Sequence, residues 1–445
     1  MTSASLLTRR GFLRRVGLAG AAAPFFTRNL LSAPPSEAVR HASFGASGMA
    51  ASDVEAITRH PAVKLTAIAD VDLDRAAEMK KKFPDARVYQ DWRQLLDKEA
   101  GNIDSVNVST PDHMHAPIGM SALQLGKHMY GQKPLTHDIY ETRRLTEAAR
   151  ERKLTTQMGI QIHSASEYRL AVRLIQDLAI GKVKEVHTWS GKKWGDTSAR
   201  PDRSDPVPRN FDWDLWLGIA AERPYLGGGY YQPGNWRKRL DFGTGTFGDM
   251  GCHIYDPVFK ALALTAPVSV RSEGPAPNAW NWAVDAVIHY VFPGTPYSEG
   301  NTIKVTWYDG DQRPPKDVQA LLGAEPVPDQ GSIFIGAKGV LLLPHIAAPR
   351  LLPEAQFESY KAPRVTGEDH WRQFVEACRG NGKTSAGFDY SGPLTEAVLL
   401  GGVATHFPKT TLEWDAAKLQ FSNVPEAGRY VRRAYRKGWE VRGLS

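Results

Sequence analysis

The sequence has little cysteine and almost no long apolar run. Its two cysteines, Cys252 and Cys378, are too few for a disulfide framework, and we expect Cys378 to be buried on an apolar helix face. Outside the N-terminal 33 residues, no segment approaches the roughly 18 consecutive apolar residues of a membrane-spanning helix. We therefore predict no stable membrane insertion, and we assign no metal ligands.

A large excess of positive charge is also missing once the N-terminus is set aside. The formal net charge is +7. Five arginines lie within residues 1–33, which contain no acid: Arg9, Arg10, Arg14, Arg15 and Arg28. Without those five the net charge is +2, which argues against a nucleic-acid partner.

The N-terminus itself has the pattern of an export signal. Twin arginines followed by Gly-Phe-Leu precede a short apolar run, Val16–Phe26, and small residues end at Ala33. This order is typical of the twin-arginine route, which moves folded proteins; the alternative is a basic amphipathic helix on a membrane surface. We predict a signal at residues 1–33 and a location in the periplasm or cell exterior. Such export suits an enzyme whose cofactor is inserted first.

The length predicts two domains, because 445 residues exceed one ordinary core. We place the first at residues 34–160 and the second at 161–445, and leave open that the C-terminal segment packs back on the first. Strands alternate with helices from Val39–Phe44 to Thr155–Gly159. This alternation predicts a Rossmann-type α/β domain with a doubly wound parallel sheet.

A turn of small residues follows the first strand. It comprises Gly45, Ser47, Gly48 and Met49, and Asp70 ends the next strand. The pattern predicts a dinucleotide site, because small residues let backbone N–H groups approach a pyrophosphate and the acid can hold both ribose hydroxyls. Ser47 and Ala50 replace two glycines of the usual G-x-G-x-x-G pattern. Asp70 favours NAD over NADP, because its charge would repel a 2′-phosphate.

Four polar residues lie just past predicted strand ends: Thr110, His115, Lys133 and Gln161. Ligands on doubly wound sheets bind outside the carboxyl ends of the strands. These side chains are therefore expected at the ligand edge. Lys133 is the strongest candidate, because it is held before Pro134.

The stretch Phe247–Pro257 carries the clearest candidate chemistry. Asp249, His253 and Asp256 are spaced i, i+4 and i+7, which places them on one face of a helix. Alternatively, Asp256 caps a helix that starts at Pro257, with the other two residues in the preceding loop. An acid beside an imidazole can move a proton near neutral pH. The alternative is a structural histidine beside a capped helix.

Aromatic residues precede this stretch, and strands follow it. Trp194 and Trp236 lie near glycine-rich segments and are candidate substrate platforms, while other aromatics belong to the core. Five later segments read as strands joined mostly by turns, which predicts an α+β domain with a large, mostly antiparallel sheet. They are Val268–Glu273, Val284–Phe292, Thr302–Tyr308, Ser332–Ile335 and Val340–Pro344.

Taken in order, these motifs resemble the glucose–fructose oxidoreductase, inositol dehydrogenase and MocA family. The resemblance implies Lys133, Asp249 and His253 as the catalytic group. It implies that Thr110, Pro111, His115, Gln132 and Lys133 bind the cofactor, and that Gln161, Trp194, Trp236 and Asp256 bind substrate. Gln132 departs from the family's usual Glu. The resemblance also implies a homo-oligomer formed through the C-terminal sheet.

The expected activity is hydride transfer between NAD and a secondary alcohol of a sugar or polyol, a small-molecule carbohydrate substrate. His253 would take the hydroxyl proton, Lys133 would stabilise the alkoxide, and Asp249 would fix Lys133 or a substrate hydroxyl. An exported enzyme would have to recycle a tightly bound cofactor. The alternatives are an NAD-dependent glycosidase that oxidises, eliminates and re-reduces its substrate, and a non-catalytic sugar sensor.

Overall fold

The computed structural model describes residues 38–323 and 325–445, so the predicted export signal lies outside the described residues. The first domain is built on a six-stranded sheet in the order β3-β2-β1-β4-β5-β6, with every neighbouring pair parallel. The strands are β1 (Val39–Phe44), β2 (Val63–Ala69), β3 (Arg87–Tyr89), β4 (Ser105–Val108), β5 (His128–Gly131) and β6 (Thr156–Met158). The predicted doubly wound parallel sheet is confirmed.

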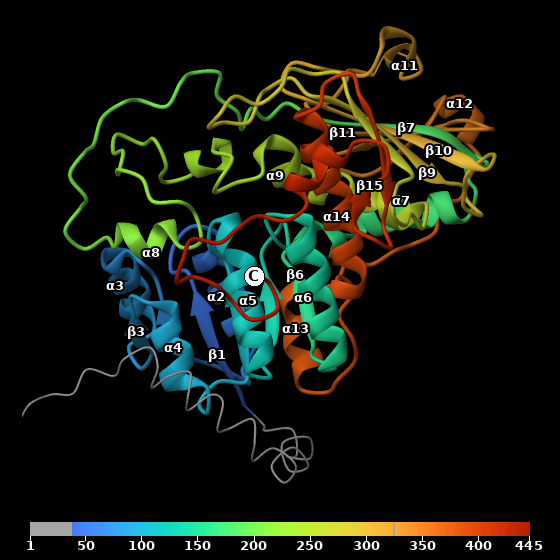
Figure 1. Ribbon diagram of the computed structural model, residues 1–445. Helices are drawn as coiled ribbons and strands as arrows, with labels where there is room; N and C mark the ends of the chain where they lie inside the picture. The colour runs from blue at the N-terminus through green and yellow to red at the C-terminus, as the bar shows by residue number, and fades with distance from the viewer. Residues whose placement is uncertain (1–37, 324) are drawn as a thin grey trace, which may run out of the picture. The chain divides into compact units, whose positions relative to one another are not determined.

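Helices from both ends of the chain pack around this sheet (Figure 1). Those between its strands are α2 (Met49–Thr58), α3 (Leu73–Lys82), α4 (Trp92–Glu99), α5 (His115–Gln124), which follows the short helix η1 (Asp112–Met114), and α6 (Ile139–Glu151). Two late helices join them: α13 (His370–Cys378) contacts α2, and α14 (Phe388–Thr405) contacts α6. The C-terminal part of the chain therefore completes the first domain.

The second domain carries a nine-stranded sheet in the order β13-β12-β11-β7-β10-β9-β8-β14-β15. Its pairs are antiparallel except β7 with β10, so the predicted mostly antiparallel sheet is confirmed. The strands are β7 (Val183–Ser190), β8 (Ser269–Ser272), β9 (Val287–Pro293), β10 (Thr302–Asp309), β11 (Gln330–Gly336), β12 (Val340–Pro344), β13 (Arg350–Leu352), β14 (Thr411–Asp415) and β15 (Gln420–Phe421).

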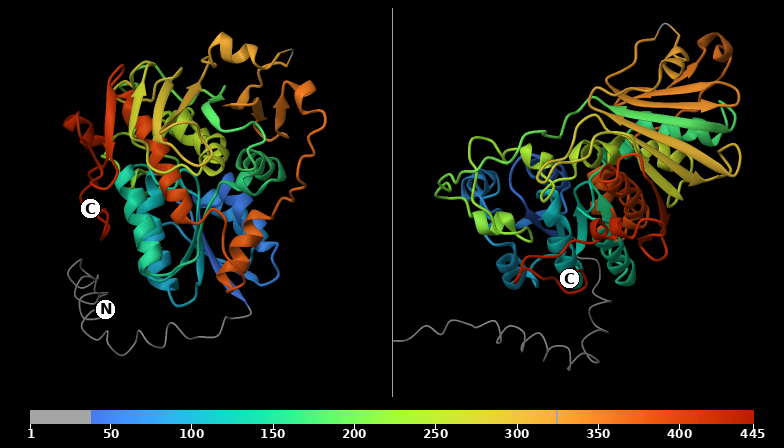
Figure 2. Two further views of the ribbon diagram at one scale, coloured as in Figure 1. Left: turned by 90° about the vertical axis from the view of Figure 1, so that its right-hand side faces the viewer. Right: turned by 45° about the horizontal axis from the view of Figure 1, so that its top comes forward.

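Several helices accompany this sheet. They are η2 (Gln161–Ser164), α7 (Ser166–Gln176), α8 (Trp213–Leu217), η3 (Asn235–Lys238), α9 (Gly245–Ile254), α10 (Asp256–Ala261), α11 (Lys316–Ala320), α12 (Glu354–Phe357) and η4 (Pro425–Tyr430). Alternate strand residues such as Tyr290 and Trp307 bury one face in the main core, which α9 and α14 share. Figure 2 shows the nine-stranded sheet as a layer separate from the parallel sheet. No helix in the described ranges is both long and apolar enough to cross a membrane.

Side chains near two element boundaries bond to the backbone. β7 ends at Ser190, where the Ser190 hydroxyl accepts a hydrogen bond from the Lys192 N–H at 3.3 Å and turns the chain. The helix α14 begins at Phe388. The Thr156 hydroxyl accepts the Phe388 N–H there, and Pro393 falls inside the early part of the helix, where its missing N–H costs one hydrogen bond.

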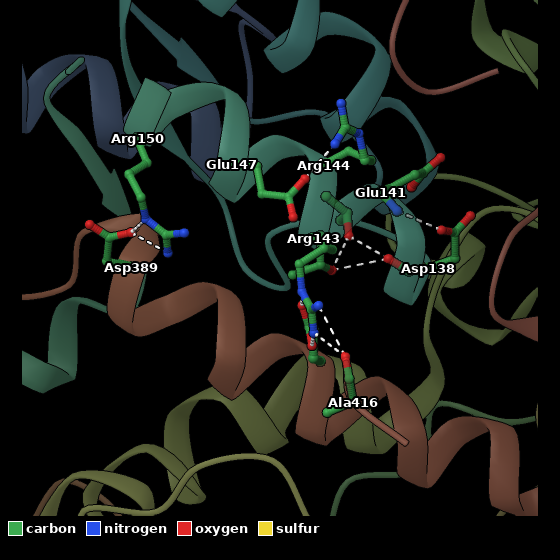
Figure 3. A network of polar contacts seen from close by, with 11 residues as sticks. Asp138, Glu141, Arg143, Arg144, Glu147, Arg150, Asp389 and Ala416 are labelled. Atoms are coloured by element: carbon green, nitrogen blue, oxygen red, sulfur yellow. Dashed lines mark hydrogen bonds and ion pairs between the residues drawn. The ribbon is translucent and has the colours of Figure 1, made fainter. Parts of the chain in front are cut away.

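Charged side chains tie α6 to the C-terminal part of the chain (Figure 3). Arg143 donates to both carboxylate oxygens of Glu396 at 2.8 Å and to the carbonyl of Ala416. At the start of α6, the Tyr435 hydroxyl donates to buried Glu141 at 2.6 Å. Burial and then the neighbouring charge of Asp138 raise the pKa of Glu141 to about 8. The end of the chain is thus anchored on the first domain.

Candidate active site

The turn after β1 has the geometry that a pyrophosphate requires. Gly45 has φ +105°, and a Cβ there would lie 2.6 Å from the Ser109 carbonyl oxygen, so only glycine fits. Gly48 has φ +58° and precedes α2, whose first turn has no side-chain cap. The free N–H groups and the helix dipole at this end favour an anion.

Asp70 lies at the end of β2, beside the same turn. Its two carboxylate oxygens accept the N–H groups of Ala46 at 2.8 Å and Asp72 at 2.9 Å. Burial raises the pKa of Asp70 to about 6 despite these bonds. Arg75 approaches the turn from α3, with its guanidinium 3.3 Å from the Ser47 hydroxyl and 3.1 Å from the Gln232 side-chain oxygen. Sequence reasoning did not identify Arg75.

A cavity of about 450 Å³ joins these groups. Its lining includes most of the predicted cofactor residues: Gly45, Ser47, Gly48, Met49, Asp70, Thr110 and Pro111. Trp236 and Arg237 line the opposite wall. Trp236, predicted as a substrate platform, is 8% exposed and packs in an aromatic cluster beside this cavity, and its role stays a prediction.

Three predicted cofactor residues do not line this cavity: His115, Gln132 and Lys133. His115 is buried, and its ring nitrogens lie 2.8 Å from the Pro134 carbonyl and 2.7 Å from the Thr110 carbonyl. It therefore holds two loops of the site together. Gln132 is buried as well, and its amide donates to Asp53 at 2.8 Å. Glutamine rather than glutamate suits this position, because a second carboxylate would oppose that of Asp53.

The structure brings Lys133 and Asp249 into direct contact across the two domains. The Lys133 ammonium donates to the Asp249 carboxylate at 2.5 Å and to its backbone carbonyl at 2.8 Å. Arg237 Nε donates to the same carboxylate at 3.0 Å and Trp194 Nε1 at 2.7 Å. Burial favours the neutral acid, but the charges of Lys133 and Arg237 outweigh it and hold the pKa of Asp249 below its ordinary value. Asp249 is therefore ionised and held from three sides.

His253 lies one turn after Asp249 on α9. Its Nδ1 is buried and has no hydrogen-bond partner among the described residues. Burial, and then the charge of Lys133, lower the pKa of His253 well below its ordinary value. The imidazole is therefore neutral near pH 7 and has a nitrogen that can accept a proton.

Of the two interpretations of Phe247–Pro257, the one that places Asp249 and His253 on a shared helix is right, because both lie in α9. Asp256 instead begins α10. It is buried, its carboxylate lies 2.9 Å from His163 Nδ1, and it accepts the Tyr390 hydroxyl at 2.6 Å. These partners occupy both oxygens, so the predicted substrate contact of Asp256 is corrected to a structural one.

The two remaining predicted substrate residues differ in their contacts. Trp194 contacts the site directly through Asp249. Gln161 lies in η2, after β6, with its side-chain oxygen buried and without a partner among the described residues. Arg237 was missed because nothing in its local sequence distinguishes it from other arginines. Its role depends on contacts with distant Asp249 and with the rings of Trp194 and Trp236.

Residues 200–240, which lie between β7 and α9 in the chain, cover the cofactor cavity. We call this segment the strap. Backbone bonds fasten the strap to the β2–α3 turn: Leu73 N–H to Asn210 at 2.9 Å and Asp212 N–H to Val71 at 2.9 Å. Figure 1 shows α8 of the strap beside α3. From the other side, Arg436 near the C-terminus donates to the Gly218 carbonyl at 3.0 Å. The β2–α3 turn and the C-terminal segment therefore hold the strap in place from two sides.

Comparison with known proteins agrees with this architecture. Residues 39–160 match the profile of an oxidoreductase family's NAD-binding Rossmann fold, and residues 178–441 match the C-terminal alpha/beta domain of the same family. The chain belongs to the glucose–fructose oxidoreductase, inositol dehydrogenase and MocA family. This confirms the family that its motifs resemble.

Among curated relatives, levoglucosan dehydrogenase of Pseudarthrobacter phenanthrenivorans is 25% identical over 189 residues, 42% of this chain and 40% of that protein. The NADP(+) scyllo-inositol 2-dehydrogenase of Bacillus subtilis is 23% identical over 48% of this chain and 49% of that protein. The alpha-N-acetylgalactosaminidase of Shewanella oneidensis is 28% identical over 34% and 35%. The chain thus matches less than half the length of these relatives.

Solved structures extend the likeness to most of the chain. The WlbA dehydrogenase of Chromobacterium violaceum, in complex with NADH and UDP-GlcNAcA, has a TM-score of 0.62 at 15% identity and covers 87% of this chain and 99% of that one. GenD2 from gentamicin A biosynthesis, in complex with NAD, has a TM-score of 0.56 at 18% identity, covering 86% and 99%. At these identities the likeness supports the fold.

Proposed function

We propose that this oxidoreductase transfers a hydride between NAD and a secondary alcohol of a sugar or polyol. The observation that carries the proposal is the bond between Lys133 and Asp249 at 2.5 Å, with His253 one helical turn away. It brings a cation, an ionised carboxylate and a neutral base together where the two domains meet. The sugar and polyol dehydrogenases among the relatives support the substrate class.

Each residue of this group has a separate task. His253 accepts the proton of the reacting hydroxyl, because its imidazole is neutral. The Lys133 ammonium stabilises negative charge on that oxygen. Asp249 keeps Lys133 in position, and Arg237 and Trp194 hold Asp249 in turn.

The cavity suits a nicotinamide dinucleotide. The uncapped start of α2 and the close turn at Gly45 fit a pyrophosphate. Asp70 suits the ribose hydroxyls of NAD, and Arg75 is already bonded to Ser47 and Gln232. When bound, the nicotinamide accepts or returns the hydride. Asp70→Ala is expected to weaken cofactor binding, and cofactor retained at full occupancy would argue against this role.

The strap supports a tightly held, recycled cofactor. Its aromatic residues and Gln232 lie over the cavity, and backbone bonds at Asn210 and Asp212 fasten it. A cofactor enclosed in this way would survive export in the folded state, as the twin-arginine pattern of residues 1–33 suggests. Replacing Arg9 and Arg10 with lysine should prevent export of the chain, as measured by cell fractionation.

We also propose that the outer face of the nine-stranded sheet pairs with a second copy. His289 and Val291 alternate along β9 on this face and are half-buried. The cluster around α11 covers the part formed by Trp189, Tyr308 and strands β11 to β13, and Val287 is partly buried against it. Light scattering of the purified chain measures the oligomeric state directly. A monomer at micromolar concentration would contradict this pairing.

A redox-neutral glycosidase is the second candidate. The similarity to an alpha-N-acetylgalactosaminidase favours it. Purified protein incubated with sugars, inositols and nitrophenyl glycosides separates the candidates. A change in bound-cofactor absorbance without aglycone release supports the dehydrogenase, and aglycone release supports the glycosidase. Tight binding with neither response would indicate a sensor and contradict both enzymes.

A further inference from the structure

A second imidazole lies near the catalytic helix, on another element of the second domain. His345 follows β12, and its ring centroid lies 6.1 Å from that of His253. Within the described part of the chain, no hydrogen bond joins the two rings, and the Nδ1 atom of His253 stays unpartnered. The proton transfer proposed above uses His253 and leaves His345 without a role.

The contact with Tyr168 determines how His345 can act. The Tyr168 hydroxyl lies 2.6 Å from His345 Nδ1. Burial raises the pKa of Tyr168 well above its ordinary value, so the hydroxyl keeps its proton and donates it to Nδ1. Burial also lowers the pKa of His345 to about 4, so the ring is neutral. A neutral ring that accepts at Nδ1 carries its hydrogen on Nε2. His345 therefore has a donor to offer, whereas His253 needs to accept.

The backbone next to His345 gives an independent sign of function. Ile346 has φ +63° and is 66% exposed. A β-branched residue rarely adopts this conformation, and such strain persists where the surrounding structure enforces it, often at functional sites. Here the His345 N–H donates to the Gln330 carbonyl at 2.9 Å, and Tyr168 holds the ring. Both backbone and side chain of His345 are thus fixed in place.

We propose that His345 is a substrate-positioning residue whose Nε2–H donates a hydrogen bond to the hydroxyl next to the one that His253 deprotonates. Hydrogen bonds of about 2.7–3.2 Å allow two neighbouring rings whose centroids are 6.1 Å apart to reach one each of two adjacent hydroxyl oxygens. The substrate class is then a sugar or polyol with vicinal hydroxyls. This inference rests on the proposed oxidoreductase function.

The test compares wild type with His345→Gln and Tyr168→Phe in the full chain. His60→Gln, in the loop between α2 and β2, is the matched control. D-glucose, D-galactose, scyllo-inositol and the 2-, 3- and 4-deoxy forms of glucose are assayed for cofactor absorbance change and, separately, for binding by tryptophan fluorescence. For the best sugar, His345→Gln should raise KM about tenfold or more with kcat changed less than threefold. The loss matches one hydrogen bond to a substrate hydroxyl.

The outcomes separate this inference from the proposed function. Wild type should distinguish the best sugar from one deoxy form, His345→Gln should lose that discrimination, and Tyr168→Phe should lose part of it. Turnover with unchanged KM in His345→Gln, or a loss confined to kcat, would overturn the inference and leave the function standing. Binding without turnover in wild type, lost in His345→Gln, would support the inference against the function. If no sugar binds the wild type, both fail.

Discussion

The two walls of the cofactor cavity are built on different physical principles. The wall from the first domain is regular: parallel strands deliver the Gly45 turn and Asp70 to one edge. The opposite wall is the strap, an irregular segment whose aromatic core and long-range bonds to Val71, Leu73 and Arg75 hold it in place. The regular wall has the features of a dinucleotide site, whereas the strap is the wall that we propose retains the cofactor.

The catalytic group lies where these two walls meet, so disrupting it should have the largest effect. Lys133→Met removes the charge that stabilises the alkoxide and leaves Asp249 with fewer partners. We expect kcat/KM to fall by about 100-fold or more, with the bound cofactor retained. Steady-state assays with the best sugar measure this. Lys82→Met, at an exposed ion pair, is the control, and activity equal to the control would remove Lys133 from the mechanism.

A single methyl group added at Gly45 should disrupt the first-domain wall of the cavity. In Gly45→Ala the new Cβ would meet the Ser109 carbonyl at 2.6 Å, at a φ of +105° that alanine avoids. We expect loss of bound cofactor and a free energy of unfolding lower by about 1–3 kcal/mol. Absorbance of the purified protein and chemical denaturation measure the two effects. Gly101→Ala is the control, because its Cβ would meet no atom within 4 Å; equal behaviour of both variants would contradict the prediction.

Weakening the attachment of the strap should change the rate of cofactor release rather than the fold. Arg75→Met removes the bonds to Ser47 and Gln232 that join the two walls. We expect cofactor release to be about 10- to 100-fold faster, in line with hydrogen bonds from a charged donor, with kcat changed little. Release into excess scavenging enzyme measures the rate. Arg173→Met, at an exposed ion pair on α7, should release cofactor at the wild-type rate. If both variants released the cofactor as slowly as the wild type, the strap would not be what retains the cofactor.

The smallest expected effect is on the pH dependence of stability where the C-terminal segment, which supports the strap, docks on the first domain. The pKa of Glu141 is raised to about 8 by burial and by Asp138, whereas an unfolded Glu titrates near pH 4.3. Between these values the folded state binds the extra proton, so stability falls as pH rises from about 4 to about 8. Glu141→Gln should flatten this dependence, raising Tm at pH 8 relative to wild type by a few degrees. Glu147→Gln, also on α6, should leave the slope unchanged.

Local sequence was sufficient wherever a feature depends on neighbouring residues. The bounds of β1, β4 and β12 follow from short apolar runs between turn residues. The Gly45 turn, Asp70 and the position of Lys133 follow from their place after strands. The spacing of Asp249 and His253 was enough to predict a shared helix face, and α9 has it. The sheet class of both domains also followed, because strand spacing limits the connections.

Other features depend on burial and on distant partners. Nothing in the sequence near Asp256 or Gln132 indicates contacts with His163 or Asp53, which lie 93 and 79 residues away in the chain. The packing of Trp236 in the aromatic cluster of the strap could not be predicted from its neighbours. The parallel pairing of β7 with β10 has no local signature either.

The sequence by itself determined the two domain types, the dinucleotide turn and the identity of the lysine, aspartate and histidine. Short-range sterics and hydrophobic periodicity act within a few residues, so they can be read along the chain. Only the tertiary structure decided that Arg237 and Trp194 hold Asp249, that His345 faces His253, and that a strap covers the cavity. Those contacts join residues on different elements, and they form only once these elements have packed together.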